Sequence, residues 1–247
     1  MNYDSPTIFQ NFPNVIAAQS TRTGGYSQGE YHTLNLGLNT KDDIGIIQKN
    51  RASFFQSLGF SIDRVADSHQ VHGIGIYRVM SPVSLYGYDA LISDQPNILL
   101  SVTIADCVPI LIYDPVNNAI AAVHSGWKGT AHKITTATIK TMAEEFGTKA
   151  KDCLAYIGTS ICEKTFEVDQ DVAQYFEADY KYWDKDRKKY LIDLKSHNRA
   201  QLLSLGVPPK NIETSPMSTV LHNDRYFSYR KEKGKTGRML AVIGIKK

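Results

Sequence analysis

Residues 105–130 read ADCVPILIYDPVNNAIAAVHSGWKGT and contain two runs of branched apolar side chains. These runs, residues 108–113 and 119–123, are apolar at successive positions, which is typical of strands that are buried on both faces. Asp114 and Pro115, which stand between them, favour a tight turn. The stretch therefore predicts a buried β-hairpin.

The expected register of this hairpin brings together two side chains that can bind a metal. If residues 114–117 form a type I turn, the numbers of facing residues sum to 231, and Cys107 lies opposite His124. Directly opposed residues have Cβ atoms about 4.5 to 5.5 Å apart, which lets a thiolate and an imidazole share one ion or one substrate atom. A slip of one residue would instead place the two side chains on opposite faces.

A third ligand has to come from another part of the chain. His69 and His72 stand in the segment SHQVHG, next to a strand-like run at residues 74–79. Residues three apart on a strand face opposite sides, so only one of the two histidines is expected to point into the site. Two imidazoles and one thiolate suit Zn²⁺ with a fourth position left open, as in catalytic zinc sites, and they also suit copper.

Outside the hairpin, apolar runs and helical patterns intermingle along the chain. The further runs that predict buried strands are residues 98–104, 154–157 and 239–245. Helical periodicity and capping residues predict four helices, near residues 42–58, 131–146, 168–178 and 194–205. This mixture predicts an α+β sandwich, in which each sheet is covered by helices on one side and by another sheet or helices on the other.

The composition is that of an ordinary globular protein. The 247 residues, 42% of them hydrophobic, are enough to bury a large core, and without repeats or linkers we expect one domain over residues 1–247. The net charge of +3 is spread along the chain, so nucleic acid is not an expected partner. The chain has no signal-like or membrane-length apolar run, and its three cysteines are expected to be reduced, which predicts a cytoplasmic protein without a membrane partner. The sequence gives no indication of the oligomeric state.

Specific motifs are spread over almost the whole chain. They are TRTGG at 21–25 with LNLG at 34–37, KNR at 49–51, QVHG at 70–73, DALIS at 89–93, ADC at 105–107, HSGWKG at 124–129, FEV at 166–168, DL at 193–194, and FSYR at 227–230 with TGR at 236–238. In these motifs the chain resembles the laccase-domain family, the polyphenol oxidoreductase-like purine nucleoside phosphorylases. It departs from the pattern at Thr159 and Ser218, where proline and cysteine are usual. The missing cysteine counts against a multicopper form of the oxidase.

The resemblance implies a fold, a metal site and an activity. The implied fold is a layered α/β/β/α sandwich with mixed sheets, similar to the catalytic domain of the cytotoxic necrotizing factors. The implied metal ligands are His72, Cys107 and His124, with zinc as the metal, and His69 lies outside the set. The implied substrates are a purine nucleoside and phosphate. The implied reactions are phosphorolysis of adenosine, inosine and methylthioadenosine and deamination of adenosine, with copper-dependent phenol oxidation at the same site as the alternative.

Phosphorolysis also needs a cation that holds phosphate near the sugar, and arginine binds such oxyanions through two parallel hydrogen bonds. Arg51 is the first candidate and is expected to complete a catalytic set with the three metal ligands. Arg22 is the second candidate for substrate binding, and Trp127 is a candidate for stacking on the purine. The basic stretch at residues 230–238 is interpreted as an exposed loop rather than an anion-binding flap.

Other hypotheses remain open at the level of sequence. A metal-free hydrolase would use Cys107 as the nucleophile and His124 as its base, which the expected hairpin supports equally well, and only the third histidine favours a metal. A non-catalytic binding module, or a cell-wall editing partner, is disfavoured by a metal site with an open position. Asp89 and Asp106 stand where a carboxylate can orient a ligand imidazole or accept a proton, or simply cap a strand end or turn.

Overall fold

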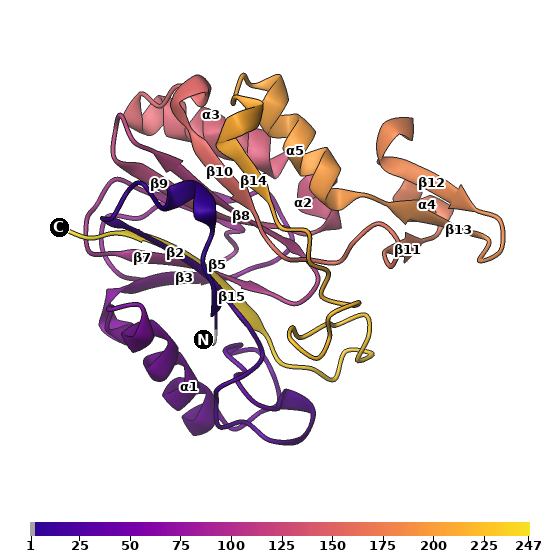
Figure 1. Cartoon of the computed structure of the whole chain (residues 1–247), viewed down its shortest axis with the longest axis horizontal. Coiled ribbons are helices and arrows are strands. Elements are labelled where there is room, and N and C mark those ends of the chain that lie inside the picture. Colours follow the sequence, from indigo (N-terminus) through magenta and orange to yellow (C-terminus); the bar gives the residue numbers. More distant parts are fainter. Residues whose placement is uncertain (1–2) are drawn as a thin grey trace.

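The computed structural model describes residues 3–247, in which two six-stranded sheets pack against each other (Figure 1). The first sheet consists, in spatial order, of β1 (Tyr3–Asp4), β2 (Val15–Ser20), β15 (Met239–Ile245), β7 (Leu99–Ile104), β3 (Val65–His69) and β5 (Ser84–Tyr86). The second consists of β14 (Ile212–Thr214), β10 (Leu154–Ile157), β8 (Val108–Asp114), β9 (Ala119–Ser125), β6 (Ala90–Ser93) and β4 (Ile76–Arg78). Both sheets contain parallel and antiparallel pairs.

Helices cover the outer faces of the two sheets, except for the short α4 (Gln170–Ala173), which contacts the small third sheet (Figure 1). The others are α1 (Ile44–Ser57), α2 (Trp127–Ala131), α3 (Ile134–Phe146) and α5 (Leu194–Ser204). Short 3₁₀ turns lie at η1 (Thr7–Phe9), η2 (Gly29–Tyr31), η3 (Ile62–Arg64), η4 (Ala150–Asp152), η5 (Ala178–Tyr180) and η6 (Pro209–Asn211). A small sheet of β11 (Glu167–Val168), β13 (Lys189–Ile192) and β12 (Lys181–Asp184) projects from one end of the molecule (Figure 1). No helix in residues 3–247 is long and apolar enough to cross a membrane.

Three apolar layers hold the sandwich together. Leu100 and Leu111 belong to the layer between the two sheets, whereas Ile110, next along the chain, packs with Met142 in the layer beneath α3 and α5. Successive strand residues point to opposite faces, so one strand contributes to both layers. A third layer around Phe54 joins the first sheet to α1. The order is helices, sheet, sheet, helix, and the predicted α+β sandwich with mixed sheets is confirmed.

The predicted helices differ from the observed ones where local contacts compete with the helix. The carboxylates of Asp43 and Asp193 accept hydrogen bonds from backbone N–H groups and so begin α1 and α5 within two residues of the predicted starts. The helix predicted at residues 131–146 is α3, which begins three residues later at Ile134, because Lys133 has a left-handed φ of +59°. The helix predicted at 168–178 is a single turn, since the carboxylate of Asp169 binds Lys189 Nζ instead of a helical N–H group.

The hairpin forms, but its predicted register is wrong. Asp114 pairs with Ala119, and His124 pairs with Pro109 rather than with Cys107. The loop has four residues because the carboxylate of Asp114 accepts hydrogen bonds from the N–H groups of Val116 (2.9 Å) and Asn117 (3.2 Å). Side chains alternate along a strand with a period of two, so this shift of two residues leaves the thiol and the imidazole on the same face.

Truncation of a side chain between the sheets is expected to destabilise the fold. Leu100 is fully buried, and Leu100→Ala should lower the free energy of unfolding by about 2–5 kcal/mol in denaturant titrations, because it leaves a cavity between the two sheets. Leu221, which is 59% exposed, is the matched control, and Leu221→Ala should change stability by about 0.5 kcal/mol or less. Equal losses in the two variants would contradict the packing described.

Candidate functional site

A cavity of about 550 Å³ lies where β3, β7 and β9 end. It is lined by Gly37, Asn39, Ser68, His69, Gln70, His72, Thr103, Ala105, Asp106, Cys107, His124, Trp127, Ile161, Phe166, Leu194, Tyr229, Arg230 and Arg238. Its volume falls in the range of small-molecule and cofactor sites. The lining combines apolar side chains with histidines, a cysteine and two arginines, so the cavity is a candidate active site.

His72, Cys107 and His124 converge in this cavity. Each offers one ligand atom, and the three atoms lie within 4.8 Å of one another. Cys107 Sγ is 3.8 Å from His72 Nε2, and the two imidazole rings are nearly perpendicular, with their centroids 4.8 Å apart. His69 lies outside the group, because its ring stacks on Tyr86 and its Nδ1 is 2.8 Å from Asn39 Nδ2. The structure thus brings together the three side chains that were expected to meet.

The carboxylate of Asp89 holds both histidines in place. It is 1% exposed and lies just before β6, where Oδ1 accepts hydrogen bonds from the backbone N–H of His72 (3.0 Å) and from His124 Nδ1 (2.8 Å). Oδ2 accepts from the N–H groups of Val71 (3.2 Å) and Gly73 (2.8 Å). Burial alone would raise the pKa of Asp89, but the hydrogen bonds outweigh it and lower this pKa. The ionised carboxylate leaves Nε2 of His124 free to face a metal.

These contacts also explain the backbone of the QVHG segment. His72 has a φ of +60°, a left-handed conformation that residues other than glycine rarely adopt. Hydrogen bonds from three successive N–H groups to one carboxylate stabilise that turn. Gln70 adds a second attachment, since its side chain donates to the carbonyl of Thr103 (2.8 Å) and accepts from the N–H of Thr103 (2.7 Å).

The thiol of Cys107 lies in an environment that favours its ionised form. Burial alone would raise the pKa of this thiol, but the imidazoles of His124 and His72 outweigh it and lower the pKa to about 6. Burial in turn would lower the pKa of His124, but the charges of Cys107 and Asp89 outweigh it and raise this pKa. A thiolate is the form of cysteine that binds metals and acts as a nucleophile.

The space between the three side chains fits a metal ion. A Cβ atom on Gly126 would lie 3.0 Å from His72 Cδ2 and 3.2 Å from Cys107 Sγ, so this glycine leaves the centre of the group open. Two imidazoles and a thiolate are ligands for Zn²⁺ and for copper. Three protein ligands around an open space are typical of a catalytic metal site rather than a structural one.

The other expected site residues divide into two groups. Trp127 lines the cavity from the start of α2, with its ring 6.0 Å from that of Tyr175. Arg51 and Arg22 do not line it. Arg51, 4% exposed, donates to the carbonyl of Leu36 (3.0 Å) and pairs with Asp67. The roles of Trp127, Arg51 and Arg22 in substrate binding stay predictions from the sequence.

Arg22 and Asp106 both contact the C-terminal segment. Arg22 donates to the carbonyls of His32 and Asn223 and pairs with Glu232. Asp106 lines the cavity, and its carboxylate accepts from the Ser228 hydroxyl (2.7 Å) among other groups of the C-terminal half. Both side chains therefore support the segment that follows residue 222.

The sequence predicts the exposure of this C-terminal segment only in part. Lys231, Lys233 and Lys235 are exposed, as expected for a basic loop. Arg230 is exposed as well, although it lines the cavity, whereas Thr236 and Gly237 are buried and the half-buried Arg238 lines the cavity. The interpretation of residues 230–238 as an exposed loop is therefore wrong at the C-terminal end of the stretch. The only signal in the sequence was that specific motifs, FSYR and TGR, contain these two arginines.

Most of the chain matches a known protein family. Residues 16–246 match the profile of the multi-copper polyphenol oxidoreductase laccase family. The chain belongs to this family. The resemblance seen in the sequence motifs is thereby confirmed.

Relatives of this laccase-family chain include proteins named purine nucleoside phosphorylase. The one from Deinococcus radiodurans is 38% identical over 237 residues, which cover 94% of this chain and 91% of the relative. The one from Bacteroides thetaiotaomicron is 32% identical over 263 residues, with coverage of 100% and 96%. The crystal structure of YlmD from Geobacillus stearothermophilus has a TM-score of 0.94 at 29% identity, covering 100% of this chain and 97% of that one. The laccase-family fold is therefore shared over the full length.

Loss of charge at Asp89 is expected to weaken metal binding. Asp89→Asn puts an N–H₂ group where two hydrogen-bond acceptors are needed, so zinc affinity in a chelator competition assay should fall about 10- to 100-fold. Asp114→Asn is the matched control, because Asp114 is also buried and accepts backbone hydrogen bonds but does not line the cavity. Equal zinc affinities in the two variants would show that Asp89 does not orient the ligands.

Proposed function

We propose that this chain is a zinc-dependent purine nucleoside phosphorylase of the cytoplasm. Its proposed substrates are adenosine, inosine and methylthioadenosine together with phosphate, and adenosine deamination is its proposed second reaction. The observation that carries the proposal is the convergence of His72, Cys107 and His124 in a cavity with room for a nucleoside. The names of the relatives support the choice of substrate class.

The proposed metal ligands favour zinc over copper. A thiolate and two imidazoles with an open position match the ligand sets of catalytic zinc sites. In the part of the chain that the structure describes, His72, Cys107 and His124 form the one group of three or more histidine, cysteine, aspartate or glutamate side chains close enough to hold a metal. An oxidase with several copper ions would need more such groups, so phenol oxidation with copper in the same site is the weaker candidate.

The cavity offers surfaces of the right chemistry for a nucleoside. One part of the lining is apolar and aromatic, which suits the faces of a purine, and is formed by Trp127, Ile161, Phe166, Leu194 and Tyr229. Another part is polar, which suits the hydroxyl groups of ribose, and is formed by Asn39, Ser68, Gln70 and Thr103. The proposed metal ligands line the same cavity, so a nucleoside in it would reach them.

The proposed reaction exchanges a base for phosphate at the sugar. An oxygen of inorganic phosphate forms a bond to C1′ as the bond from C1′ to N9 breaks, and the electron pair leaves with the purine, which gains a proton. The products are ribose 1-phosphate and the free base. Zinc, when bound, would act as a Lewis acid and polarise an oxygen atom of a reactant. The protein side chains bind the two substrates in one orientation and exclude water, and Asp89 keeps His124 oriented.

Product analysis tests this proposal. Incubation with inosine should give hypoxanthine and ribose 1-phosphate only when phosphate is present, and chelation should abolish the reaction until zinc is restored. Cys107→Ala should be at least about 100-fold slower, because it removes the only thiolate of the site. Cys162→Ala, which changes a half-buried thiol outside the cavity lining, is the control and should keep its activity.

The same experiment separates the metal enzyme from a cysteine hydrolase. A metal-free hydrolase that uses Cys107 as its nucleophile would survive chelation and would be inactivated by iodoacetamide. Turnover that persists in chelator would therefore contradict the proposed zinc dependence. Release of the base without any need for phosphate would contradict phosphorolysis.

A further inference from the structure

Two arginines on the cavity wall lack a carboxylate partner. Arg230 and Arg238 line the cavity, and neither forms an ion pair within residues 3–247, whereas Arg22, Arg51 and Arg225 each pair with an acidic side chain. Burial lowers the pKa of Arg238, against the opposing effects of Tyr229, Asp106 and Cys107. A partly buried cation without a counter-charge is stabilised when an anion binds beside it.

Arg238 presents a free edge of its guanidinium. Nη1 donates to the carbonyls of Thr236 (2.8 Å) and Gly237 (3.0 Å), and the group lies over the ring of Tyr229, 5.4 Å from its centroid. Nε and Nη2 have no acceptor in the described part of the chain. These two nitrogens form the fork with which arginine binds phosphate through two parallel hydrogen bonds.

Arg230 is less suited to this role. Its side chain is exposed, its guanidinium stacks on Phe166, and Nη1 donates to the carbonyl of Glu167 (3.0 Å). Its backbone N–H donates to Asp106, which fixes the main chain rather than the charged group. Arg238 is therefore the stronger of the two candidates for anion binding.

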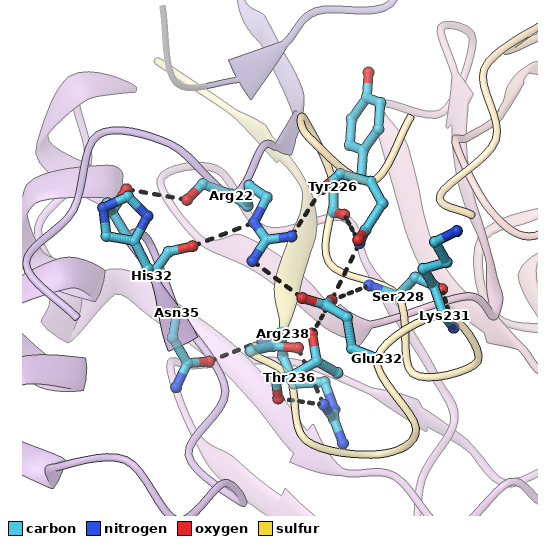
Figure 2. A network of polar contacts seen from close by, with 12 residues as sticks. Arg22, His32, Asn35, Tyr226, Ser228, Lys231, Glu232, Thr236 and Arg238 are labelled. Atoms are coloured by element: carbon cyan, nitrogen blue, oxygen red, sulfur yellow. Dashed lines mark hydrogen bonds and ion pairs between the residues drawn. The ribbon is translucent and has the colours of Figure 1, made fainter. Parts of the chain in front are cut away.

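Glu232 links the two ends of the loop that carries Arg238 through hydrogen bonds (Figure 2). Oε2 accepts hydrogen bonds from the Ser228 N–H (3.0 Å) and from the Thr236 hydroxyl (2.5 Å), so one carboxylate joins the two ends of the loop. Oε1 pairs with Arg22 Nη2 at 3.1 Å, which attaches the loop to the body of the protein. Arg22 therefore contacts the loop that carries Arg238.

Gly37 and Asn35 fix the base of the Arg238 side chain. Asn35 Oδ1 accepts from the backbone N–H groups of Arg238 (2.8 Å) and Gly37 (3.1 Å), which brings the two segments together (Figure 2 shows the first of these bonds). A Cβ atom on Gly37 would lie 2.6 Å from Cβ and 2.5 Å from Cγ of Arg238. These atoms are close to the backbone and cannot move aside easily, so any larger residue at position 37 would displace the arginine.

We propose that the Nε and Nη2 edge of Arg238 binds the phosphate that attacks C1′, and that Gly37, Asn35 and Glu232 are positioning residues for this guanidinium. The reaction named here rests on the proposed function. Binding of inorganic phosphate does not, because it needs no nucleoside and no turnover.

Calorimetric titration of the zinc-loaded full-length protein with inorganic phosphate tests the site directly. Wild-type protein should bind phosphate, and Arg238→Gln should bind it about 10- to 100-fold more weakly with unchanged zinc content, because a charge-assisted pair of hydrogen bonds is lost. Arg238→Lys, which keeps the charge without the fork, should fall between the two. Arg64→Gln changes an exposed arginine that is not part of the cavity lining and should bind like wild type. Wild-type affinity in Arg238→Gln, or no binding by wild type, would overturn the proposal.

Gly37→Ala is a second variant, which keeps the positive charge of Arg238 but displaces its side chain. It should weaken phosphate binding while the zinc content stays at the wild-type value, and its melting temperature should show that it is folded at the assay temperature. In turnover, Arg238→Gln should raise the KM for phosphate about 10-fold or more and change the KM for inosine by about 2-fold or less. If wild type binds phosphate and Arg238→Gln does not, yet no phosphorolysis is found, the phosphate site stands and the proposed function fails.

Discussion

The carboxylate of Asp89 accepts hydrogen bonds from three successive backbone N–H groups, those of residues 71–73, and from the ring of His124. It thereby joins the loop after β3 to the end of β9, two segments that belong to different sheets. Without it, three partly buried backbone donors would lose their acceptor and the left-handed turn at His72 would lose its support. The position of both imidazoles therefore depends on one side chain that itself stays outside the cavity lining.

Asp106 and Cys107 connect this centre to the opposite wall of the cavity. The thiol of Cys107 faces the two histidines, while the carboxylate of Asp106 accepts hydrogen bonds from the hydroxyls of Thr219 and Ser228. It also accepts from the backbone N–H of Arg230, the first residue of the cationic stretch. Of these two adjacent residues, Cys107 offers a thiolate to the proposed metal, and Asp106 fixes the segment that we propose to bind an anion. This arrangement places the two charges that the proposed reaction needs in one cavity.

Much of the fold could be predicted, because its strands and helix ends are determined by local patterns. Strands 154–157 and 239–245 have the predicted bounds, since continuous apolar runs specify buried strands. The register of the hairpin could not be predicted, because it depends on how the Asp114 side chain binds the turn. Cys107 and His124 still lie on the same face, because the observed register differs from the predicted one by two residues. Arg238 could not be found, because its place depends on Asn35, about 200 residues away in the chain.

In the proposed enzyme, His72, Cys107 and His124 bind one metal ion together. X-ray absorption spectroscopy of the zinc-loaded protein measures this most directly. We expect about one zinc per chain, with one sulfur ligand at about 2.3 Å and nitrogen ligands at about 2.0–2.1 Å. His72→Ala should lose one nitrogen ligand or the metal itself, and His69→Ala, which changes a histidine three residues away, should match wild type. A spectrum without sulfur, or an identical spectrum in His72→Ala, would contradict the account.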